Sequence, residues 1–332
     1  KLAETALSAI SGELNGLYAK TGRPSIPPER LLKAQLLIAF YSVRSDRLFC
    51  EQLDYNLLFR WFLDLDLESG GLDQSNFSRL RERLVQTAIA RRFFDEVVRL
   101  ARKDKLLSSD HFTVDGTLID AWASFKSFKR KDDDEPPKPG DGTGMVDFKG
   151  EKRSNATHQS TTDPDAKLMR KGNGQPARLS YGGHALMENR SGLCVDLLIT
   201  DATLAEHQAA RQLLTRARRR KIHPKTLGAD KGYHVKDFVQ HLREHNIRPH
   251  IARIEGRKTP GLDGRTTRTA GYKVSQRKRK RIEEIFGWLK TVGGMRKTRF
   301  IGQTRTQIAA YLSAAAYNLL RIAKLQSAGS AA

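Results

Sequence analysis

Two aspartates lie in strand-like runs, where this residue type is unfavourable. Asp115 lies in the middle of TVDGTL, and Asp230 ends the run TLGAD. Aspartate is depleted in strands and is costly to bury without a partner. Each aspartate alone has an ordinary explanation, such as a turn, a cap or a salt bridge to one of the 59 Lys and Arg residues. The hypothesis of a shared site therefore rests on the pair and on the helix that follows.

That helix, SQRKRKRIEEIFGWLKTV, supplies a third acid. On a helical wheel that starts at Arg279, Lys290 falls at about 20°, Glu283 at about 40° and Glu284 at about 140°. A regular helix thus directs Glu283, and not Glu284, toward the edge of the face that packs on the sheet. The expected apolar stripe consists of Ile282, Ile285, Phe286 and Leu289.

Three carboxylates that converge repel one another unless a cation lies among them, and hard divalent ions take such oxygen ligands. Two Mg²⁺ ions about 3.5 to 4 Å apart would activate a water or a 3′-hydroxyl and stabilise the leaving oxygen of a phosphodiester. We therefore predict a metal site of Asp115, Asp230 and Glu283. Asp120 is a weaker rival, because it lies where the strand should end.

The composition favours a polyanionic partner. A formal charge of +22 arises from 59 basic and 37 acidic residues, and each neutralised phosphate releases counterions. No apolar stretch is long enough to span a membrane, and neither a basic amphipathic helix nor a lipid anchor is found. Cys50 and Cys194 lack a CxxC pattern, which favours a reducing, intracellular setting. No glycine-rich run ends in GK[ST], so ATP is not expected.

Residues 1 to about 105 show helical periodicity, with prolines at 27 and 28 that open a helix and glycines at 70 and 71 that break the chain. The helix after Gly71 carries Arg79 and has Asp73 or Ser75 as its cap. This order is similar to a loose helix-turn-helix. An all-helical domain with a solvated basic face is the favoured interpretation, and DNA contact by Arg79 is the alternative.

From residue 109 the period changes to that of strands. The expected order is three strands, a helix, a strand, a helix, a strand and a long helix, which predicts a mixed sheet flanked by helices. Residues 125–180 are rich in Lys, Asp, Pro and Gly, and we expect a long insertion that is poorly ordered without DNA or a second protomer. The predicted domains are residues 1–107 and 108–327.

Several residues of the basic helix are candidate DNA contacts. Arg279 and Lys290 are expected to bind phosphates, and Arg277 and Arg281 extend the same basic surface. Trp288 lies opposite the apolar stripe, where it could stack on a flipped base or be covered by another domain. His184 and His207 lack partners at metal-ligand spacing, and we interpret them as structural. We expect the C-terminal segment with Ile308, Leu312, Ala315, Leu319 and Ile322 to pack in the core.

The blocks TVDGTL, LGADKGYH and RKRIEEIFGWLKTVGGMRKTR resemble the three catalytic blocks of bacterial insertion-sequence transposases of the DDE superfamily. The stretch GRPSIPPERLLKAQLLIAFYSVRSDRLFCEQLDYNLLFRWFLDL is similar to their InsH-type N-terminal domain. The resemblance covers most of the chain outside the insertion. By position, it assigns Asp115, Asp230 and Glu283 as the catalytic and metal-binding acids.

The resemblance implies a ribonuclease-H-like fold, Mg²⁺ dependence with Mn²⁺ as a substitute, cleavage at transposon ends and joining of 3′ ends to target DNA. It also implies double-stranded DNA with terminal inverted repeats as partner, a homodimer in the synaptic complex, and a bacterial, cytoplasmic, nucleoid-associated location. The family's Tyr, Arg, Glu, Lys signature matches at Arg279, Glu283 and Lys290, but Gln276 stands at the Tyr position. Tyr272 lies one turn earlier and is a candidate substitute.

Two other functions fit the same residues. One is a related nuclease without strand transfer, which would use the same metal site. The other is a non-catalytic DNA-binding protein in which the three acids are structural. The three hypotheses differ in whether substitution of each acid abolishes cleavage while DNA binding persists.

Overall fold

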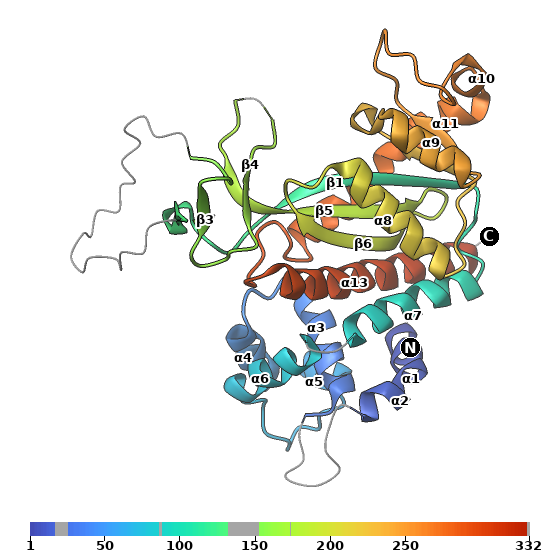
Figure 1. The fold of residues 1–332 in the computed structure, drawn as a ribbon. Coiled ribbons are helices and arrows are strands. Elements are labelled where there is room, and N and C mark those ends of the chain that lie inside the picture. Colours follow the sequence, from blue (N-terminus) through green and yellow to red (C-terminus); the bar gives the residue numbers. More distant parts are fainter. Residues whose placement is uncertain (17–25, 86–87, 132–152, 173, 331–332) are drawn as a thin grey trace.

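The computed structural model describes residues 1–16, 26–85, 88–131, 153–172 and 174–330 (Figure 1). Its centre is a mixed sheet in which three antiparallel strands are followed by two parallel ones. β1 pairs antiparallel with β5 and parallel with β7, β5 pairs antiparallel with β6, and β7 pairs parallel with β8. The resulting order β6-β5-β1-β7-β8 is ribonuclease-H-like and confirms the predicted fold. The strands are β1 (His111–Asp120), β5 (Arg178–Glu188), β6 (Leu193–Asp201), β7 (Thr226–Ala229) and β8 (Arg248–Ile251).

The hairpin between β5 and β6 forms where the sequence predicts it. Gly192 has a φ of +71°, which a residue with a side chain rarely adopts. The Arg281 guanidinium lies close to this glycine: a Cβ on Gly192 would be 3.0 Å from Arg281 Nε. A larger residue at 192 would therefore strain the turn and displace Arg281.

Helices connect the parallel strands, because parallel pairing requires a crossover. α8 (Glu206–Arg219) joins β6 to β7, and α9 (Lys236–Glu244) joins β7 to β8. α8 is amphipathic: its buried side chains face the sheet and its last turn is basic. In Figure 1, α8 begins beside the middle of β1 and runs down across the sheet.

The N-terminal region is helical, as predicted, but its segments are more broken than the periodicity suggests. The expected third segment ends at Tyr55 and a new helix begins at Leu57, because the Asn56 side chain accepts a hydrogen bond from the Phe59 amide. Asp73 caps the next helix through the amide of Asn76. The helices are α1 (Leu2–Ala9), α2 (Ser11–Asn15), α3 (Pro28–Phe40), α4 (Asp46–Tyr55), α5 (Leu57–Phe62), α6 (Gln74–Val85) and α7 (Ile89–Lys103).

α13 (Gln303–Ser330) lies between the helical region and the sheet (Figure 1). It packs against α3, α7 and β6. The expected packing face is buried at Leu312, Ala315, Leu319 and Ile322, and Ile308 is half-buried. No described helix is long and apolar enough to cross a membrane.

The expectation of poor order across residues 125–180 is wrong for the described parts of this segment. A short sheet of β2 (Phe128–Arg130) and β3 (His158–Ser160) follows η1 (Phe125–Ser127), and β4 (Lys167–Met169) pairs with β5. Buried hydrogen bonds hold it: the Ser127 and Ser160 hydroxyls are 2.7 Å apart, and the Tyr181 hydroxyl donates to Asp163. Residues 132–152 lie outside the described residues.

The expectation of one uninterrupted basic helix through residues 275–292 is also wrong. It consists of α11 (Ala270–Lys278), a single 3₁₀ turn η3 (Arg279–Arg281) and α12 (Ile282–Thr291), preceded by the short α10 (Gly264–Thr267). The two main parts dock on different partners. Tyr272 and Gln276 of α11 donate to backbone carbonyls of β8, whereas α12 packs on β1. The tighter turn between them allows both contacts.

Candidate metal centre

Asp115 occupies the middle of β1, opposite Ala185 of β5. Its Oδ1 accepts a hydrogen bond of 2.8 Å from the amide of Gly116. The pKa of Asp115 is raised to about 6, chiefly by burial and also by the nearby carboxylates of Asp230 and Glu283, while the Gly116 hydrogen bond and Arg279 lower it. Asp115 is therefore within electrostatic reach of both other predicted acids.

Asp230 directly follows β7, whose parallel pairing with β1 brings this strand end close to Asp115. Its Oδ1 accepts a 2.8 Å hydrogen bond from the amide of Gly232 and caps the turn η2 (Lys231–Tyr233). The carboxylate is thus held by local backbone geometry at the carboxyl end of a parallel strand, where sites in such sheets gather.

Glu283 is the second residue of α12, and its side chain is exposed. The neighbouring Glu284 forms an ion pair with Arg281, with Nε and Oε2 3.5 Å apart. Of the two glutamates, Glu283 is among the charges that raise the pKa of Asp115. The assignment of Glu283 stays a prediction, and the regular helix that the wheel assumed is replaced by a 3₁₀ turn at residues 279–281.

A fourth carboxylate, not anticipated from the sequence, lies beside this set. Glu206 is the first residue of α8, and its carboxylate is near both Asp115 and Asp230. Its pKa is raised to about 7, mainly by burial and then by these two acids. A glutamate in the first turn of a helix is common because it complements the helix dipole. The sequence therefore carries no signal that distinguishes Glu206 from an ordinary first-turn acid.

These four carboxylates share one property. Within the described part of the chain, none lies within salt-bridge distance of a Lys or Arg, although the chain has a formal charge of +22. Other buried acids in the described residues have protein donors: Asp196 contacts three arginines, Asp46 contacts two, and Asp163 and Glu188 accept hydrogen bonds from neutral groups. A set of carboxylate oxygens that lacks a protein cation matches the ligand preference of hard divalent ions.

The carboxylates are spread more widely than the ligands of a single ion. Among the described residues, the one group of three or more His, Cys, Asp or Glu ligand atoms within 4.8 Å of one another is His241, Glu244 and His245 on α9. Asp115, Asp230, Glu206 and Glu283 do not form such a group. This spacing suits a site shared by two ions better than a cage around one.

The predicted phosphate-binding residues lie around the acids in different settings. Arg279 donates from Nε to Gln276 Oε1 at 3.0 Å, and Lys290 donates from Nζ to Thr117 Oγ1 at 2.6 Å. Burial lowers the pKa of Lys290. Arg277 is exposed, whereas Arg281 donates to the backbone carbonyls of Asn189 and Arg190. Arg281 therefore holds the β5–β6 hairpin against η3.

Trp288 is half-buried and packs edge-on against Tyr317, with ring centroids 5.8 Å apart. Arg79 on α6 is exposed and donates to Asn76. Neither residue contacts the four carboxylates. Tyr272 and Gln276, the two candidates for the signature Tyr position, both donate to carbonyls of β8.

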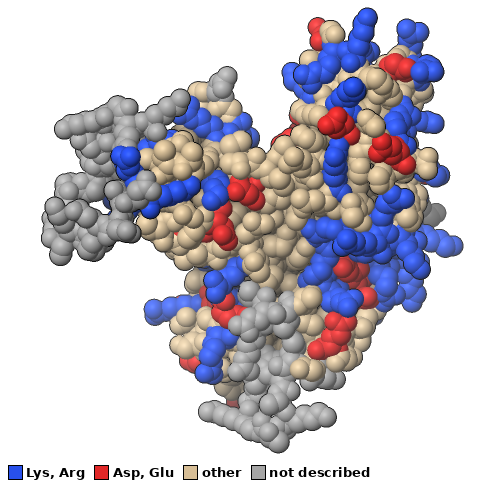
Figure 2. All heavy atoms as spheres, in the orientation of Figure 1, with Lys and Arg blue, Asp and Glu red and all other residues tan. Residues whose placement is uncertain are grey.

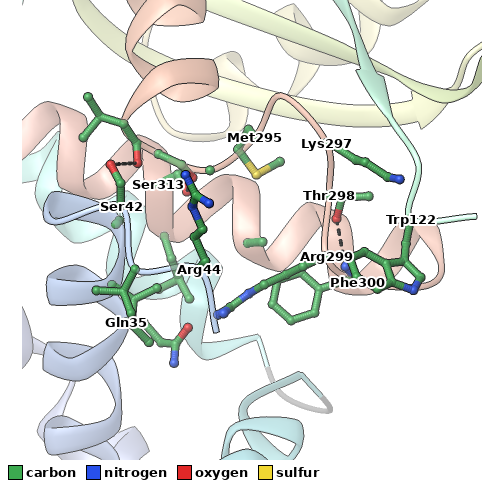
Figure 3. A pocket seen from close by; sticks show the side chains of 18 residues that line it. Gln35, Ser42, Arg44, Trp122, Met295, Lys297, Thr298, Arg299, Phe300 and Ser313 are labelled. Atoms are coloured by element: carbon green, nitrogen blue, oxygen red, sulfur yellow. Dashed lines mark hydrogen bonds between the residues drawn. The ribbon is translucent and has the colours of Figure 1, made fainter. Parts of the chain in front are cut away.

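A separate cavity of about 260 Å³ lies where the helical region meets the sheet (Figure 3). Arg44, Arg299 and Lys297 line it, together with Trp122 just after β1. Trp122 is 53% exposed, and Lys297 Nζ is 5.6 Å from its ring centroid. An exposed indole beside cations is typical of surfaces that bind unpaired nucleotides. No pattern in the sequence around Trp122 predicts this role.

On the face shown in Figure 2 the molecule is hollowed between two lobes, one with β2–β4 and one with α9–α11. Lys and Arg side chains cover both lobes and form a band over the C-terminal end of α8. The last turn of α8 carries Arg216, Arg218 and Arg219.

Comparison with known proteins gives two family matches. Residues 2–83 match a transposase domain of the DUF772 type, and residues 147–319 match a transposase DDE domain. Asp230, Glu283 and Glu206 lie inside the second match, and Asp115 lies between the two. No curated protein matches.

Among solved structures, the piggyBac transposase synaptic complex with hairpin DNA aligns with a TM-score of 0.46 and 9% identity over 99% of this chain and 73% of that chain. A pre-cleavage Mos1 transpososome aligns with a TM-score of 0.23 and 11% identity over 92% and 80% of the two chains. The DDE-domain match spans more than half of the 332 residues, so this chain belongs to the transposase DDE-domain family and is a DNA transposase.

Proposed function

We propose that Asp115, Asp230 and Glu283 bind the divalent metal ions with which this transposase cleaves transposon ends and joins 3′ ends to target DNA. The observation that carries the proposal is the set of converging carboxylates without a protein cation, in a chain of strongly positive charge. Mutual repulsion at such a site is relieved by divalent cations. Buried acids elsewhere in the described residues are satisfied by the protein instead, Asp196 by arginines and Asp163 by the Tyr181 hydroxyl.

Each acid has a distinct structural support for this role. β1 holds Asp115 in the centre of the sheet, the turn after β7 orients Asp230, and α12 presents Glu283 from the side. Bound divalent ions, Mg²⁺ with Mn²⁺ as a substitute, would supply a nucleophilic water or hydroxyl and stabilise the leaving oxygen. Arg279, whose charge acts on Asp115, and Lys290, which donates to Thr117 two residues along β1, would neutralise and orient the phosphate.

The partners of the proposed reaction are double-stranded DNA with terminal inverted repeats and target DNA. The Lys and Arg side chains on both lobes of the hollowed face support this assignment, because phosphate contacts dominate DNA affinity (Figure 2). We further propose that residues 1–107 bind DNA or a second protomer, with Arg79 exposed on α6, and that residues 108–327 form the catalytic domain. Paired cleavage of two ends requires a homodimer.

The remaining predicted contacts keep their proposed roles with different structural support. Arg277 is free to contact the DNA backbone, whereas Arg281 would do so only alongside its contacts with Asn189 and Arg190. Trp288 would have to leave its contact with Tyr317 to stack on a base. We propose that Gln276 and Tyr272 together take the place of the signature Tyr, since both anchor α11 to β8.

The test uses an oligonucleotide that carries a terminal inverted repeat. Asp115→Asn, Asp230→Asn and Glu283→Gln should each abolish cleavage with Mg²⁺ or Mn²⁺ while DNA binding in a gel shift is retained. Glu284→Gln is the matched control and should keep cleavage, because Glu284 pairs with Arg281 outside the site. Cleavage by any of the three variants at the wild-type rate would overturn the assignment. Cleavage without joining to a target duplex would instead identify a nuclease.

A further inference from the structure

We propose that Glu206 is a fourth carboxylate ligand of the divalent-metal site. The inference rests on the proposed function of Asp115, Asp230 and Glu283 and extends it to a residue of α8. The site would bind a hard divalent cation, and Mn²⁺ is the spectroscopic probe for it.

Two glycines show how closely Glu206 approaches the aspartates. A Cβ on Gly116, the residue after Asp115, would lie 2.8 Å from Glu206 Oε1. A Cβ on Gly232 would lie 3.0 Å from Asp230 Oδ1 and 3.6 Å from Glu206 Oε2. One oxygen of Glu206 thus reaches the backbone beside Asp115, and the other faces the turn that holds Asp230.

Two buried polar groups face the same place without a partner. His184, 3% exposed, donates from Nε2 to Thr200 Oγ1, because the Thr200 hydroxyl proton is used on the Asp201 carbonyl. His184 Nδ1 therefore carries a free lone pair. A Cβ on Gly116 would lie 3.1 Å from this nitrogen and 2.8 Å from Glu206 Oε1, so both atoms border the same small space. Within the described residues, neither Nδ1 nor Glu206 has a hydrogen-bond donor.

Tyr233, fully buried, also has a hydroxyl without a hydrogen-bond partner among the described residues. The carboxylates of Glu206, Asp115 and Asp230 all lie within electrostatic reach of this hydroxyl. Unsatisfied buried polar atoms are rare and indicate an ion or water that completes the site. A cation with its bound water would provide the donors that the His184 lone pair lacks and would balance the carboxylates.

The ordinary explanation of Glu206 accounts for only part of this arrangement. A favourable interaction with the α8 dipole explains an acid at the first position of the helix. It does not explain why the side chain turns toward two other carboxylates, which repel it, when no Lys or Arg of the described chain lies within salt-bridge distance. A shared cation explains both the direction and the lack of a partner.

The experiment is a Mn²⁺ titration of the full chain without DNA, followed by electron paramagnetic resonance of the free ion. Glu206→Gln should lose one of the bound ions or raise the Mn²⁺ Kd roughly tenfold or more, because removal of a ligand charge weakens hard-cation sites. A second readout is the rise in Tm on Mn²⁺ addition, which should shrink in this variant. Asp237→Asn, an exposed acid in the first turn of α9, is the control and should bind Mn²⁺ as the wild type does.

Circular dichroism establishes whether Glu206→Gln folds, and Glu206→Asp provides a second variant that keeps the charge. If Asp115→Asn loses Mn²⁺ while Glu206→Gln and Glu206→Asp bind it like the wild type, the role of Glu206 is overturned and the three-acid site stands. If the wild type binds no Mn²⁺, the metal site itself is overturned, and Glu206 with it.

Discussion

At the scale of single residues, the unusual feature is a group of carboxylates that are protonated more easily than their type normally allows. Asp115 has a pKa of about 6 and Glu206 a pKa of about 7, compared with ordinary values of about 3.9 and 4.3. Burial is the largest cause for both, and the neighbouring acids add to it. In the protein without metal, each therefore holds its proton to a higher pH in the folded state than in the unfolded chain.

This difference predicts how stability depends on pH. Between about pH 4 and 7 these two carboxyl groups bind more protons in the folded state than in the unfolded chain, so their contribution to the free energy of unfolding of the metal-free protein falls as the pH rises. His184 and His250, whose pKa values burial lowers to about 4, contribute in the opposite direction. Thermal unfolding with a chelator at pH 5.5 and pH 8 therefore isolates Asp115 as the difference in Tm between Asp115→Asn and the wild type, which should be larger at pH 8. A Tm that depends on pH equally in the wild type and in this variant would contradict the prediction.

Metal affinity should show the opposite trend, because the ligand carboxylates must be deprotonated to bind. The Mn²⁺ Kd should fall as the pH rises from 5.5 to 8, with most of the change near pH 6 to 7. Isothermal titration with Mn²⁺ at several pH values provides the measurement. A Kd that stays constant over this range would show that Asp115 and Glu206 do not bind the ion.

Gly116 is a residue whose lack of a side chain has a specific consequence. In Gly116→Ala the new Cβ would meet Glu206 Oε1 at 2.8 Å and His184 Nδ1 at 3.1 Å. Glu206 must then move, and we expect Mn²⁺ affinity and cleavage to fall together while the protein still folds. Gly287→Ala, at an exposed position of α12, is the control, since nothing lies within 4 Å of a Cβ built there. Equal Mn²⁺ affinity in both variants would remove the argument from close approach.

At the scale of elements, periodicity was sufficient for the core sheet but not for the details of the site. The β-branched and aromatic run at residues 111–119 and the apolar run at 226–229 predicted β1 and β7, and the turn at 189–192 predicted the hairpin. These elements bury one pattern of side chains, so their sequence reflects their structure directly. Asp115 and Asp230 were identifiable because they interrupt that pattern.

The parts that the sequence did not predict depend on tertiary contacts. The 3₁₀ turn at residues 279–281 exists because α11 docks on β8 and α12 on β1, and no local propensity reports this. Glu206 joins the site because α8 begins next to β1, which only the crossover geometry specifies. The small sheet of β2 and β3 brings together residues about 30 positions apart. Sequence periodicity does not extend across such a gap.

One buried charge network links the helical region to the sheet. Asp196 of β6 is fully buried and accepts hydrogen bonds from Arg91 of α7, from Arg216 of α8 and from Arg220, which directly follows α8. Arg91 also donates to the Tyr311 hydroxyl of α13. The network around this carboxylate thus joins four elements.

Asp196→Ala should destabilise the protein strongly, because three guanidinium groups would lose their shared anion. Removal of one partner from a buried ion network costs about 3 to 5 kcal/mol. Urea unfolding followed by circular dichroism measures the loss. Glu51→Ala, which breaks an exposed ion pair with Arg47 within α4, should change stability far less. A similar small effect for Asp196→Ala would show that the network does not hold the elements together.

At the scale of the whole molecule, the positive charge is divided between two uses. Some arginines form ion pairs with buried acids, as around Asp196 and Asp46. Others are exposed, including Arg218 and Arg219 at the end of α8, which have no ion pair among the described residues. The band of Lys and Arg in Figure 2 lies over this end of α8. Exposed, unpaired cations on a surface of this kind are available for phosphate contacts.

DNA affinity should therefore depend steeply on salt, and the dependence should report these arginines. The logarithm of the association constant falls with the logarithm of salt concentration by about 0.9 per neutralised phosphate. If Arg218 and Arg219 each contact a phosphate, the double variant Arg218→Glu/Arg219→Glu should flatten the slope by about 1.8. Fluorescence anisotropy with a labelled duplex at several salt concentrations measures the slope.

The matched control changes the net charge by the same amount at arginines that are already paired. Arg47 pairs with Glu51 and Arg265 pairs with Asp263, and all four side chains are exposed. Arg47→Glu/Arg265→Glu should lower affinity through the overall field but leave the slope closer to that of the wild type. Equal slopes for the two double variants would mean that the charge of the molecule as a whole, and not contacts at the end of α8, sets the salt dependence.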